Sequence, residues 1–348
     1  MPGKSSATRA IQVSSHGGPD VLRQVMLPVP EPGPGELLVR IHASGVCGHD
    51  VLARAGRIPL PVPQVLGHEG AGEVVSVGPG VTGLAVGDRV ALTPMLPCGY
   101  CNSCLSGQSR TCRVRGGLYG EDIAGTYAEH VLANAYSAVK LPDTIDYVGG
   151  SILGCAVGTA VRAVSRGRVR MGETVVVTGA TGGVGIHLVQ VARAAGARVI
   201  AVTGSADKVP ALREAGSDEV VVAGREPFEE EVRSLTDGAG ADVVLDNVGP
   251  PVFRSCLGSL RTTGRLVLVG NVDPTDVPTN LGQMIMREFE LIGTARPGRT
   301  ELQQAIRLVV NGRVRPWVSR TFPLEQASDA HRFMEDRRAV GRCVLVAV

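Results

Sequence analysis

The second half of the chain alternates between short apolar segments and stretches long enough to form helices. From Glu173 onward the apolar segments read TVVVTG, RVIAVTG, EVVVAG, DVVLDNV and GRLVLVGN. Short strands separated by helix-length segments are typical of βαβ units, which build a parallel sheet with helices on both faces. The segment FELIGTA, residues 289–295, can supply a sixth strand. The pattern therefore predicts an α/β protein with a doubly wound parallel sheet.

The first of these segments runs directly into a glycine-rich turn, VVVTGATGGVG. Its glycines are spaced G-x-x-G-G-x-G between a predicted strand and a predicted helix, the context in which such a motif indicates a dinucleotide site. A pyrophosphate would lie at the helix N-terminus, where free N–H groups and the helix dipole favour anions. An ordinary glycine-rich strand–helix turn is the alternative. The residues predicted to surround the pyrophosphate are Gly179, Thr181, Gly182, Gly183, Val184 and Gly185.

The end of the second predicted strand, VIAVTGSADK, bears on which nicotinamide cofactor is used. A fold that prefers NAD places Asp or Glu here to bind the ribose 2′-hydroxyl. This chain instead has Thr203 and Ser205, with Lys208 nearby, while Asp207 comes late enough to begin the next helix. Because no carboxylate repels a 2′-phosphate, the turn favours NADP(H) over NAD(H).

Residues 35–142 have a different sequence pattern, in which short apolar segments are interrupted by Gly and Pro. This pattern predicts a β-rich domain of small strands and long loops. A chain of 348 residues exceeds what one hydrophobic core usually supports, so two domains are expected. The change of pattern puts domain boundaries near Tyr147 and near Gly293.

Four cysteines stand as C-x2-C-x2-C-x7-C in the polar segment PCGYCNSCLSGQSRTC. Four thiolates at this spacing can fold back onto one ion, as in structural zinc sites. The bacterial iron–sulfur pattern has a shorter last spacing followed by Pro, and unconnected buried thiols do not suit so polar a segment. The predicted zinc site is closed, so its role is to hold a loop. Its ligands are Cys98, Cys101, Cys104 and Cys112.

Three further residues together resemble a second metal site. Cys47 lies in GVCGHD, His68 in LGHEGAGEV and Cys155 in GCAVGTA. Separately, each has a commoner explanation, as a buried thiol or a hydrogen-bonded histidine. Together, two cysteines and one histidine leave one coordination position open, which is the ligand set of a catalytic zinc.

The chain resembles the zinc-containing alcohol dehydrogenase branch of the medium-chain dehydrogenase/reductase superfamily. The resemblance is carried by four motifs in the family's order: GHE-x2-G-x-V, VGDRV, the four-cysteine loop and the GGVG turn. The resemblance spans nearly the whole chain. It implies a GroES-like zinc-binding catalytic domain of residues 1–147 and 294–348, and a Rossmann NADP(H)-binding domain of residues 148–293. It also implies pairing through the strand at residues 289–295, giving a homodimer or a homotetramer.

The same resemblance implies roles for residues near the predicted zinc. Cys47, His68 and Cys155 would hold the catalytic zinc, and Glu69 would lie beside it, either as an occasional fourth ligand or as a carboxylate that contacts the ligands without binding the metal. Asp50 would orient His68 through its second ring nitrogen. The residues implied to contact the cofactor are Arg342, close to Asp50 and the phosphates, and Thr159, Gly270 and Asn271 at the nicotinamide half.

His49 departs from the family pattern, because this place usually carries a Ser or Thr that passes on the alcohol proton. The position three residues later, a histidine in some relatives, is Leu52 here. Either His49 contacts the substrate oxygen itself, or it points away and water carries the proton. Because imidazole is a competent acid or base near neutral pH, we favour direct contact.

Three functions fit these features. The first is a zinc-dependent alcohol dehydrogenase or carbonyl reductase that exchanges hydride with NADP(H). The second is an NADPH-dependent reductase of enoyl thioesters, since TGATGGVGIH, DVVLDNVG and GNVDPT resemble acryloyl-CoA reductases, and Arg54, Arg57 and Arg115 are candidate contacts for a CoA phosphate. The third is a non-catalytic protein that binds zinc and NADPH, which the complete ligand set disfavours.

Charge and hydropathy disfavour several classes of partner. The formal net charge is +2 and the pI about 8.2, with charges scattered along the chain, so neither nucleic acid nor an anionic membrane is expected. Residues 1–9 lack a signal-peptide pattern, and no apolar run approaches the roughly 18 residues of a membrane span. We therefore expect a cytoplasmic enzyme with a small-molecule substrate.

Overall fold

The computed structural model of the chain describes residues 7–114, 117–223, 227–273 and 275–347. These residues form two compact units. The first unit comprises Met1–Gly158, Arg296–Val310 and Val318–Val348, and the second comprises Thr159–Ala295 and Asn311–Trp317. Among the described residues, no helix combines the length and the apolar character needed to cross a membrane.

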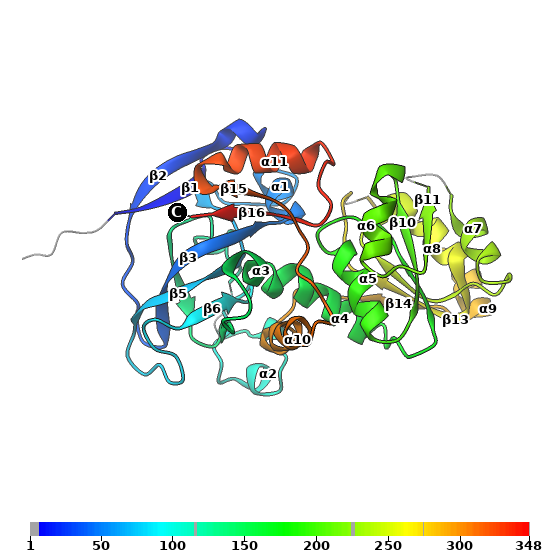
Figure 1. Cartoon of the computed structure of the whole chain (residues 1–348), viewed down its shortest axis with the longest axis horizontal. Helices are drawn as coiled ribbons and strands as arrows, with labels where there is room; N and C mark the ends of the chain where they lie inside the picture. Colours follow the sequence, from blue (N-terminus) through cyan, green and yellow to red (C-terminus); the bar gives the residue numbers. More distant parts are fainter. Residues whose placement is uncertain (1–6, 115–116, 224–226, 274, 348) are drawn as a thin grey trace, which may run out of the picture. The chain divides into compact units, whose positions relative to one another are not determined.

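A seven-stranded sheet forms the body of the first unit, in the order β15-β16-β3-β5-β6-β8, with β7 also paired to β3. The last strand, β16, lies antiparallel to β3 with Cys343 opposite Val46, so the end of the chain completes a sheet begun near its start (Figure 1). The strands of this sheet are β3 (Glu36–Val46), β5 (Glu69–Val77), β6 (Arg89–Leu92), β7 (His130–Asn134), β8 (Ala138–Lys140), β15 (Val318–Pro323) and β16 (Arg342–Val346).

A smaller sheet and several short helices complete the first unit. The three strands of the smaller sheet have the order β2-β1-β4. They are β1 (Ala7–Val13), β2 (Leu22–Pro28) and β4 (Gln64–Val65). The helices are α1 (Gly48–Arg54), α2 (Asn102–Leu105), α3 (Tyr147–Ser151), α10 (Arg299–Val310) and α11 (Ala327–Glu335), and α4 (Gly158–Arg166) begins at the last residue of this part of the chain.

The second unit contains a six-stranded parallel sheet in the order β11-β10-β9-β12-β13-β14. The chain enters at β9, moves outward to β11, then returns to β12 and moves outward to β14, which is the predicted doubly wound order. Helix α5 packs on β9 and β10, α6 on β11, and α8 on β12 and β13. The predicted fold class is therefore confirmed, with FELIGTA supplying the sixth strand.

The bounds of the elements in this unit follow the sequence pattern closely. The strands are β9 (Thr174–Val177), β10 (Arg198–Thr203), β11 (Glu219–Val222), β12 (Ala241–Asp246), β13 (Leu260–Leu268) and β14 (Glu290–Gly293). The helices are α5 (Gly185–Ala194), α6 (Val209–Glu214), α7 (Glu229–Ser234), α8 (Phe253–Ser259) and α9 (Leu281–Arg287).

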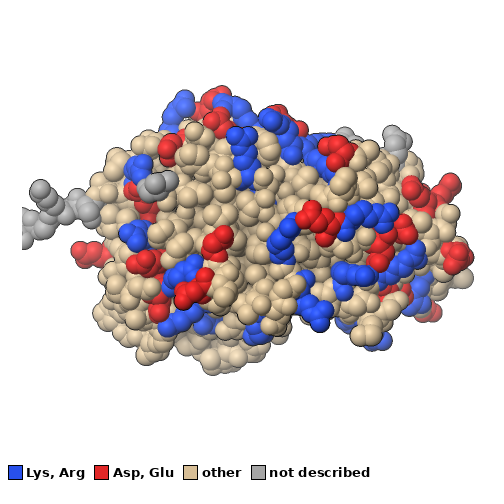
Figure 2. All heavy atoms as spheres, in the orientation of Figure 1, with Lys and Arg blue, Asp and Glu red and all other residues tan. Residues whose placement is uncertain are grey.

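Consecutive apolar residues in the second unit's strands are buried on both faces of the sheet. Val175, Val176 and Val177 of β9 are each 0% exposed. Such runs of β-branched residues are typical of parallel strands covered by helices on both sides. Charged side chains of both signs are interspersed over the face of the molecule drawn in Figure 2, as the scattered charges of the sequence predict.

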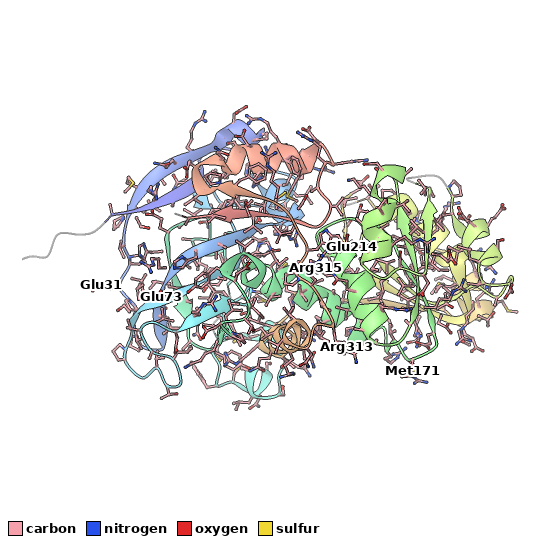
Figure 3. The ribbon with its side chains drawn as sticks, viewed as in Figure 1. Glu31, Glu73, Met171, Glu214, Arg313 and Arg315 are labelled. Atoms are coloured by element: carbon pink, nitrogen blue, oxygen red, sulfur yellow. The ribbon has the colours of Figure 1, made fainter. Side chains whose placement is uncertain are left out.

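The segment Asn311–Trp317 belongs to the second unit because it is bonded to α5. The backbone of Arg315 exchanges two hydrogen bonds with the side chain of Gln190, and the N–H of Trp317 donates to Nε2 of His187 at 2.9 Å. On the surface, the Arg315 guanidinium pairs with Glu214 of α6 at 2.9 Å (Figure 3). The boundaries predicted near residues 147 and 293 leave this segment out of the second unit, because nothing in the sequence pattern indicates that the chain returns there.

Candidate functional site

Cys47 stands at the junction between β3 and α1. Its backbone is extended, and its N–H donates to Oδ2 of Asp50 at 2.9 Å, so Asp50 caps the N-terminus of α1. A carboxylate three residues into a helix commonly satisfies the N–H of the capping residue in this way. The sequence GVCGHD therefore fixes the Cys47 backbone at the point where the strand becomes a helix.

His68 and Glu69 enter the site from the start of β5. Gly67 precedes them with a φ of +94°, and a Cβ there would lie 2.4 Å from the Tyr127 ring, so only glycine fits. A Cβ at Gly45, on the neighbouring strand β3, would lie 2.1 Å from Oε2 of Glu69. The two glycines leave room for the turn and for the Glu69 carboxylate.

Cys155 lies on the π-helical segment η3 (Leu153–Val157). Segments of this kind widen a helix by one residue per turn and occur frequently at functional sites. The preceding residue is Gly154, where a Cβ would lie 2.0 Å from the carbonyl oxygen of Leu92 in β6. Close packing of this segment on the sheet therefore fixes where the Cys155 thiol lies.

These three segments bring one set of metal-competent groups together. The candidate ligand atoms of Cys47, His68, Glu69 and Cys155 all lie within 4.8 Å of one another. Two thiols and an imidazole are ligands that zinc prefers, and Oε2 of Glu69 has no hydrogen-bond donor among the described residues. The donor set therefore fits a zinc ion with Glu69 beside it.

The electrostatics of this cluster favour a thiolate at Cys47. Contact with the Cys155 thiol, together with the positive charges of Arg342 and His68, holds the pKa of Cys47 well below that of a free thiol. Burial raises the pKa of Glu69 to about 7, although the nearby Arg342 opposes this shift. A thiolate is the form of cysteine that binds zinc, so Cys47 is prepared for a metal ion.

Two charged side chains, Asp50 and Arg342, contact residues of the candidate zinc site. Nδ1 of His68 lies 3.2 Å from Oδ1 of Asp50, which has the distance of an ion pair without the alignment of a good hydrogen bond. Nη2 of Arg342 lies 2.8 Å from Oε1 of Glu69, and both side chains are almost fully buried. The Arg342 guanidinium is thus engaged with Glu69 inside the first unit, and its contact with cofactor phosphates stays a prediction.

His49 has a partner that the sequence did not indicate. Its Nε2 forms an ion pair with Glu121, and Arg296 lies 3.7 Å from the other carboxylate oxygen of Glu121. Burial lowers the pKa of His49, but the Glu121 carboxylate and the Cys47 thiolate raise it more, so the net shift is upward. The His49 and His68 rings meet edge to face with centroids 5.8 Å apart, so this pair lies beside the candidate zinc site.

The four cysteines of the loop also come together. The candidate ligand atoms of Cys98, Cys101, Cys104 and Cys112 lie within 4.8 Å of one another. The backbone N–H of Cys98 points to the Cys112 sulfur and that of Cys101 to the Cys98 sulfur, both at 3.3 Å. The geometry fits the closed zinc site predicted from the spacing.

In the second unit, the glycine turn joins β9 to α5. Gly179 has a φ of +55°, and a Cβ at Gly185 would lie 2.1 Å from the Gly179 carbonyl oxygen. The turn is therefore as tight as its spacing predicts. The other predicted pyrophosphate residues, Thr181, Gly182, Gly183 and Val184, lie between these two glycines.

The residues predicted to select the cofactor lie at the end of β10. Thr203 is buried, and its Oγ1 accepts the backbone N–H of Ser205 at 3.3 Å. Lys208 ends the short helix that follows, and Asp207, one residue before it, is exposed. Thr203, Ser205 and Lys208 therefore lie on one short segment, from the end of β10 to the end of the helix that follows it.

The predicted nicotinamide contacts, Gly270 and Asn271, follow β13 beside a loop that the sequence analysis left without a role. Asp246, at the end of β12, is buried and accepts the Thr178 hydroxyl at 2.6 Å and the N–H groups of Val248 and Gly249. A Cβ at Gly270 would lie 2.5 Å from the carbonyl oxygen of Asn247 in this loop. The Asp246 carboxylate therefore ties the loop after β12 to the end of β9, and Gly270 packs against the same loop. Thr159, on α4, belongs to the same unit.

Comparison with known protein families decides the classification. Residues 33–143 match the alcohol dehydrogenase GroES-like domain, and residues 183–311 match the zinc-binding dehydrogenase domain. The chain belongs to the medium-chain dehydrogenase/reductase superfamily. It is an oxidoreductase of that superfamily, in its zinc-binding alcohol dehydrogenase branch, whose nicotinamide cofactor is NAD(P).

Similar proteins match the chain over almost its full length. An acryloyl-coenzyme A reductase from Metallosphaera sedula is 37% identical over 97% of this chain and 99% of the relative. A crystal structure of AibC has a TM-score of 0.92 and 42% identity, covering 99% of this chain and 97% of that one. The structure of an NAD-dependent alcohol dehydrogenase has a TM-score of 0.91 and 36% identity, covering 98% and 100%.

Sequence reasoning missed two carboxylates of this medium-chain dehydrogenase/reductase. Glu121 follows Gly120, whose φ is +79°. The available signal was a charged residue directly after a glycine, in a loop close to the zinc-site motifs. Asp246 is the last residue of an apolar strand. In a doubly wound sheet, ligands bind at the carboxyl ends of the strands, so this position was the available signal. Arg54, a candidate for a CoA phosphate, is 1% exposed and paired with Glu335, so that prediction is wrong; Arg115 lies outside the described residues.

Proposed function

We propose that this chain is a zinc-dependent, NADPH-linked reductase of α,β-unsaturated acyl thioesters. The observation that carries the proposal is the convergence of Cys47, His68 and Cys155, whose ligand atoms lie within 4.8 Å of one another and leave one zinc position open. The acyl thioester is supported by the 37% identity with an acryloyl-coenzyme A reductase over 97% of this chain.

In this proposal the two bound groups supply the polar and reducing chemistry. Bound zinc would polarise the thioester carbonyl, and bound NADPH would supply a hydride for the β-carbon. Cys47, His68 and Cys155 would hold the zinc, and the Gly179–Gly185 turn would hold the pyrophosphate. The products would be the saturated thioester and NADP⁺, once a proton has been added at the α-carbon.

The chain's own acid would be His49. Its ring is held by the Glu121 carboxylate, which favours the protonated imidazolium and keeps Nε2 in one orientation. Glu121 is in turn close to Arg296, so its charge is partly balanced. An imidazolium fixed beside the zinc ligands is a suitable donor of the proton that the α-carbon needs.

The preference for NADPH rests on the end of β10. Thr203, Ser205 and Lys208 offer hydroxyl groups and a positive charge, and a carboxylate is missing from the strand end that normally binds the ribose 2′-hydroxyl of NAD. The comparison of catalytic efficiency with NADPH and NADH tests this preference. A preference for NADH on the order of tenfold, or about 1.4 kcal/mol, would contradict it.

A second candidate function is interconversion of alcohols and carbonyl compounds. The specific observation in its favour is the NAD-dependent alcohol dehydrogenase structure, which matches 98% of this chain with a TM-score of 0.91. The same zinc ligands would then hold an alcohol or carbonyl oxygen. The acid or base would again be His49, in place of the Ser or Thr of its relatives.

One experiment separates these functions. NADPH oxidation is followed with crotonyl-CoA, acryloyl-CoA, a panel of ketones and a panel of aldehydes, before and after zinc removal. The proposal expects turnover of the enoyl esters that is lost without zinc. Turnover of ketones or aldehydes alone would favour the second candidate, and no turnover with any compound would favour a non-catalytic zinc and NADPH binder.

We also propose that two copies pair through the edge strand β14. This strand ends the sheet order of the second unit, and the adjacent helix α9 exposes Leu281, Ile285 and Met286 by 72%, 73% and 79%. An unpaired strand edge beside exposed apolar residues is a common pairing surface. Sedimentation should give a dimer or a tetramer, and a monomer at micromolar concentration would contradict the proposal.

A further inference from the structure

A buried chain of polar groups runs outward from the His68–Asp50 contact. The Tyr127 hydroxyl donates to Oδ2 of Asp50 at 3.2 Å and also lies 3.2 Å from Nε2 of His331. Tyr127 and His331 are both 0% exposed, and their rings meet edge to face with centroids 5.9 Å apart. Neither residue belongs to a metal-ligand or cofactor motif.

The direction of the hydrogen bonds in this chain follows from the donors available. A carboxylate can only accept, so the single hydroxyl proton of Tyr127 points to Asp50. The Tyr127 oxygen can then only accept from His331, whose proton must be on Nε2. Burial lowers the pKa of His331 to about 4, so its ring is neutral and carries one proton. In keeping with this, Nδ1 of His331 has no partner among the described residues.

Asp50 would be held loosely without Tyr127. Its carboxylate is 2% exposed, so water does not complete its hydrogen bonding. Oδ2 accepts the Cys47 backbone N–H and the Tyr127 hydroxyl, while Oδ1 faces Nδ1 of His68. The two donors on Oδ2 therefore decide how the carboxylate plane is turned, and with it the side that His68 meets.

Helix α11 anchors the outer end of the chain. It carries His331 and also Glu335, which pairs with the buried Arg54 of α1. Asp50 and Arg54 are both on α1, one turn apart. Helix α11 thus contacts α1 at two points within the first unit, one of them through Tyr127, and these contacts fix His331 relative to Asp50.

We propose that Tyr127 and His331 are positioning residues for the candidate zinc site. They hold the Asp50 carboxylate in the orientation from which it contacts Nδ1 of His68, and thereby leave the other ring nitrogen of His68 for the metal. Partners of a metal-bound histidine typically change metal affinity 10- to 100-fold when removed. Tyr127 acts one contact further out, so we expect the low end, about tenfold. The inference rests on the proposed zinc-dependent function.

Tyr127→Phe is the direct test, and Tyr119→Phe is its matched control. Tyr119 is also 0% exposed and in the same hydrophobic core, but its hydroxyl donates to the backbone carbonyl of Leu132. Zinc per chain is measured after dialysis against a graded series of chelator concentrations. The four-cysteine site is an internal control in every sample, because the proposal leaves its affinity unchanged.

We expect Tyr127→Phe to lose one of two zinc ions at a chelator concentration about tenfold lower than the unaltered chain does. Tyr119→Phe should follow the unaltered chain. With cobalt in the catalytic site, Tyr127→Phe should also shift the visible absorption bands and Tyr119→Phe should not. Equal retention of both ions in Tyr127→Phe, or equal loss from both sites, would overturn the proposal.

Two further comparisons keep the outcome decisive. If Tyr127→Phe fails to fold, His331→Gln and His331→Leu replace it, since Gln can still donate to the Tyr127 oxygen and Leu cannot. Loss of zinc from His331→Leu alone supports the proposal, whereas equal retention in both overturns it. An unaltered chain that binds only one zinc would instead contradict the proposed function, and the inference would fall with it.

Discussion

The buried pair of Arg342 and Glu69 allows a stability prediction with a magnitude. Their charged groups lie 2.8 Å apart, and the side chains are 3% and 0% exposed. Arg342→Leu removes the positive charge and leaves the Glu69 carboxylate without its partner. Breaking a buried ion pair in this way costs about 3–5 kcal/mol, because the remaining charge is neither hydrated nor compensated. In a unit of about 150–250 residues, this loss lowers the melting temperature by about 6–20 °C.

The assay is calorimetric melting of the protein after removal of the catalytic zinc, because an ion beside Glu69 would compensate its charge. Arg54→Leu is the matched control. Arg54 is equally buried in the same unit, but its partner Glu335 is 38% exposed and can be hydrated when the arginine is lost. Arg54→Leu should therefore cost less than Arg342→Leu. Adding Glu69→Leu to Arg342→Leu should recover much of the loss. The reasoning would be refuted if Arg342→Leu had the same melting temperature as the unaltered protein, or if Arg54→Leu lowered the melting temperature more than Arg342→Leu does.

Three further predictions concern the reaction, the cofactor and pH. His49→Ala should lower turnover at least tenfold with two zinc ions retained, and Glu121→Gln should lower it less; unchanged turnover across the pH range would remove His49 from the mechanism. Lys208→Ala should weaken NADPH binding about tenfold with little change for NADH, as titrations of cofactor fluorescence would measure, and equal weakening of both would contradict the 2′-phosphate contact. In the metal-free protein, the Glu69 pKa of about 7 lies above its ordinary 4.5, so this group's contribution to stability is complete below pH 4.5 and is lost as pH rises through about 7. Melting temperatures measured between pH 5 and 8 should therefore fall less in Glu69→Gln than in the unaltered chain, and parallel profiles would contradict the shift.

The parts of the fold that the sequence predicts are those governed by local pattern. Alternating apolar segments identify the six parallel strands, because the strands inside the sheet have runs buried on both faces and the helices between them have a different period. The return of residues 311–317 to the second unit escapes such reasoning. It depends on hydrogen bonds between Gln190 and the backbone of Arg315, which lie 125 residues apart.

The candidate site divides in the same way. The glycines around Cys47 and His68 make their motifs visible, since close approach and positive φ allow few other residues. Glu121 and Tyr127 carry no such signature, because their roles come from side chains that meet only after folding. Arg54 is misread for the opposite reason: an arginine is usually exposed, and here α1 and α11 bury it.

The central claim is that Cys47, His68 and Cys155 form an open zinc site at which the substrate reacts. Cys155→Ser tests it most directly, with zinc per chain and NADPH-dependent reduction of crotonyl-CoA measured on the same sample. The account predicts two zinc ions and turnover in the unaltered chain, and one zinc ion without turnover in the variant. A variant that keeps its turnover, or an unaltered chain with zinc only at the four-cysteine site, would contradict the account.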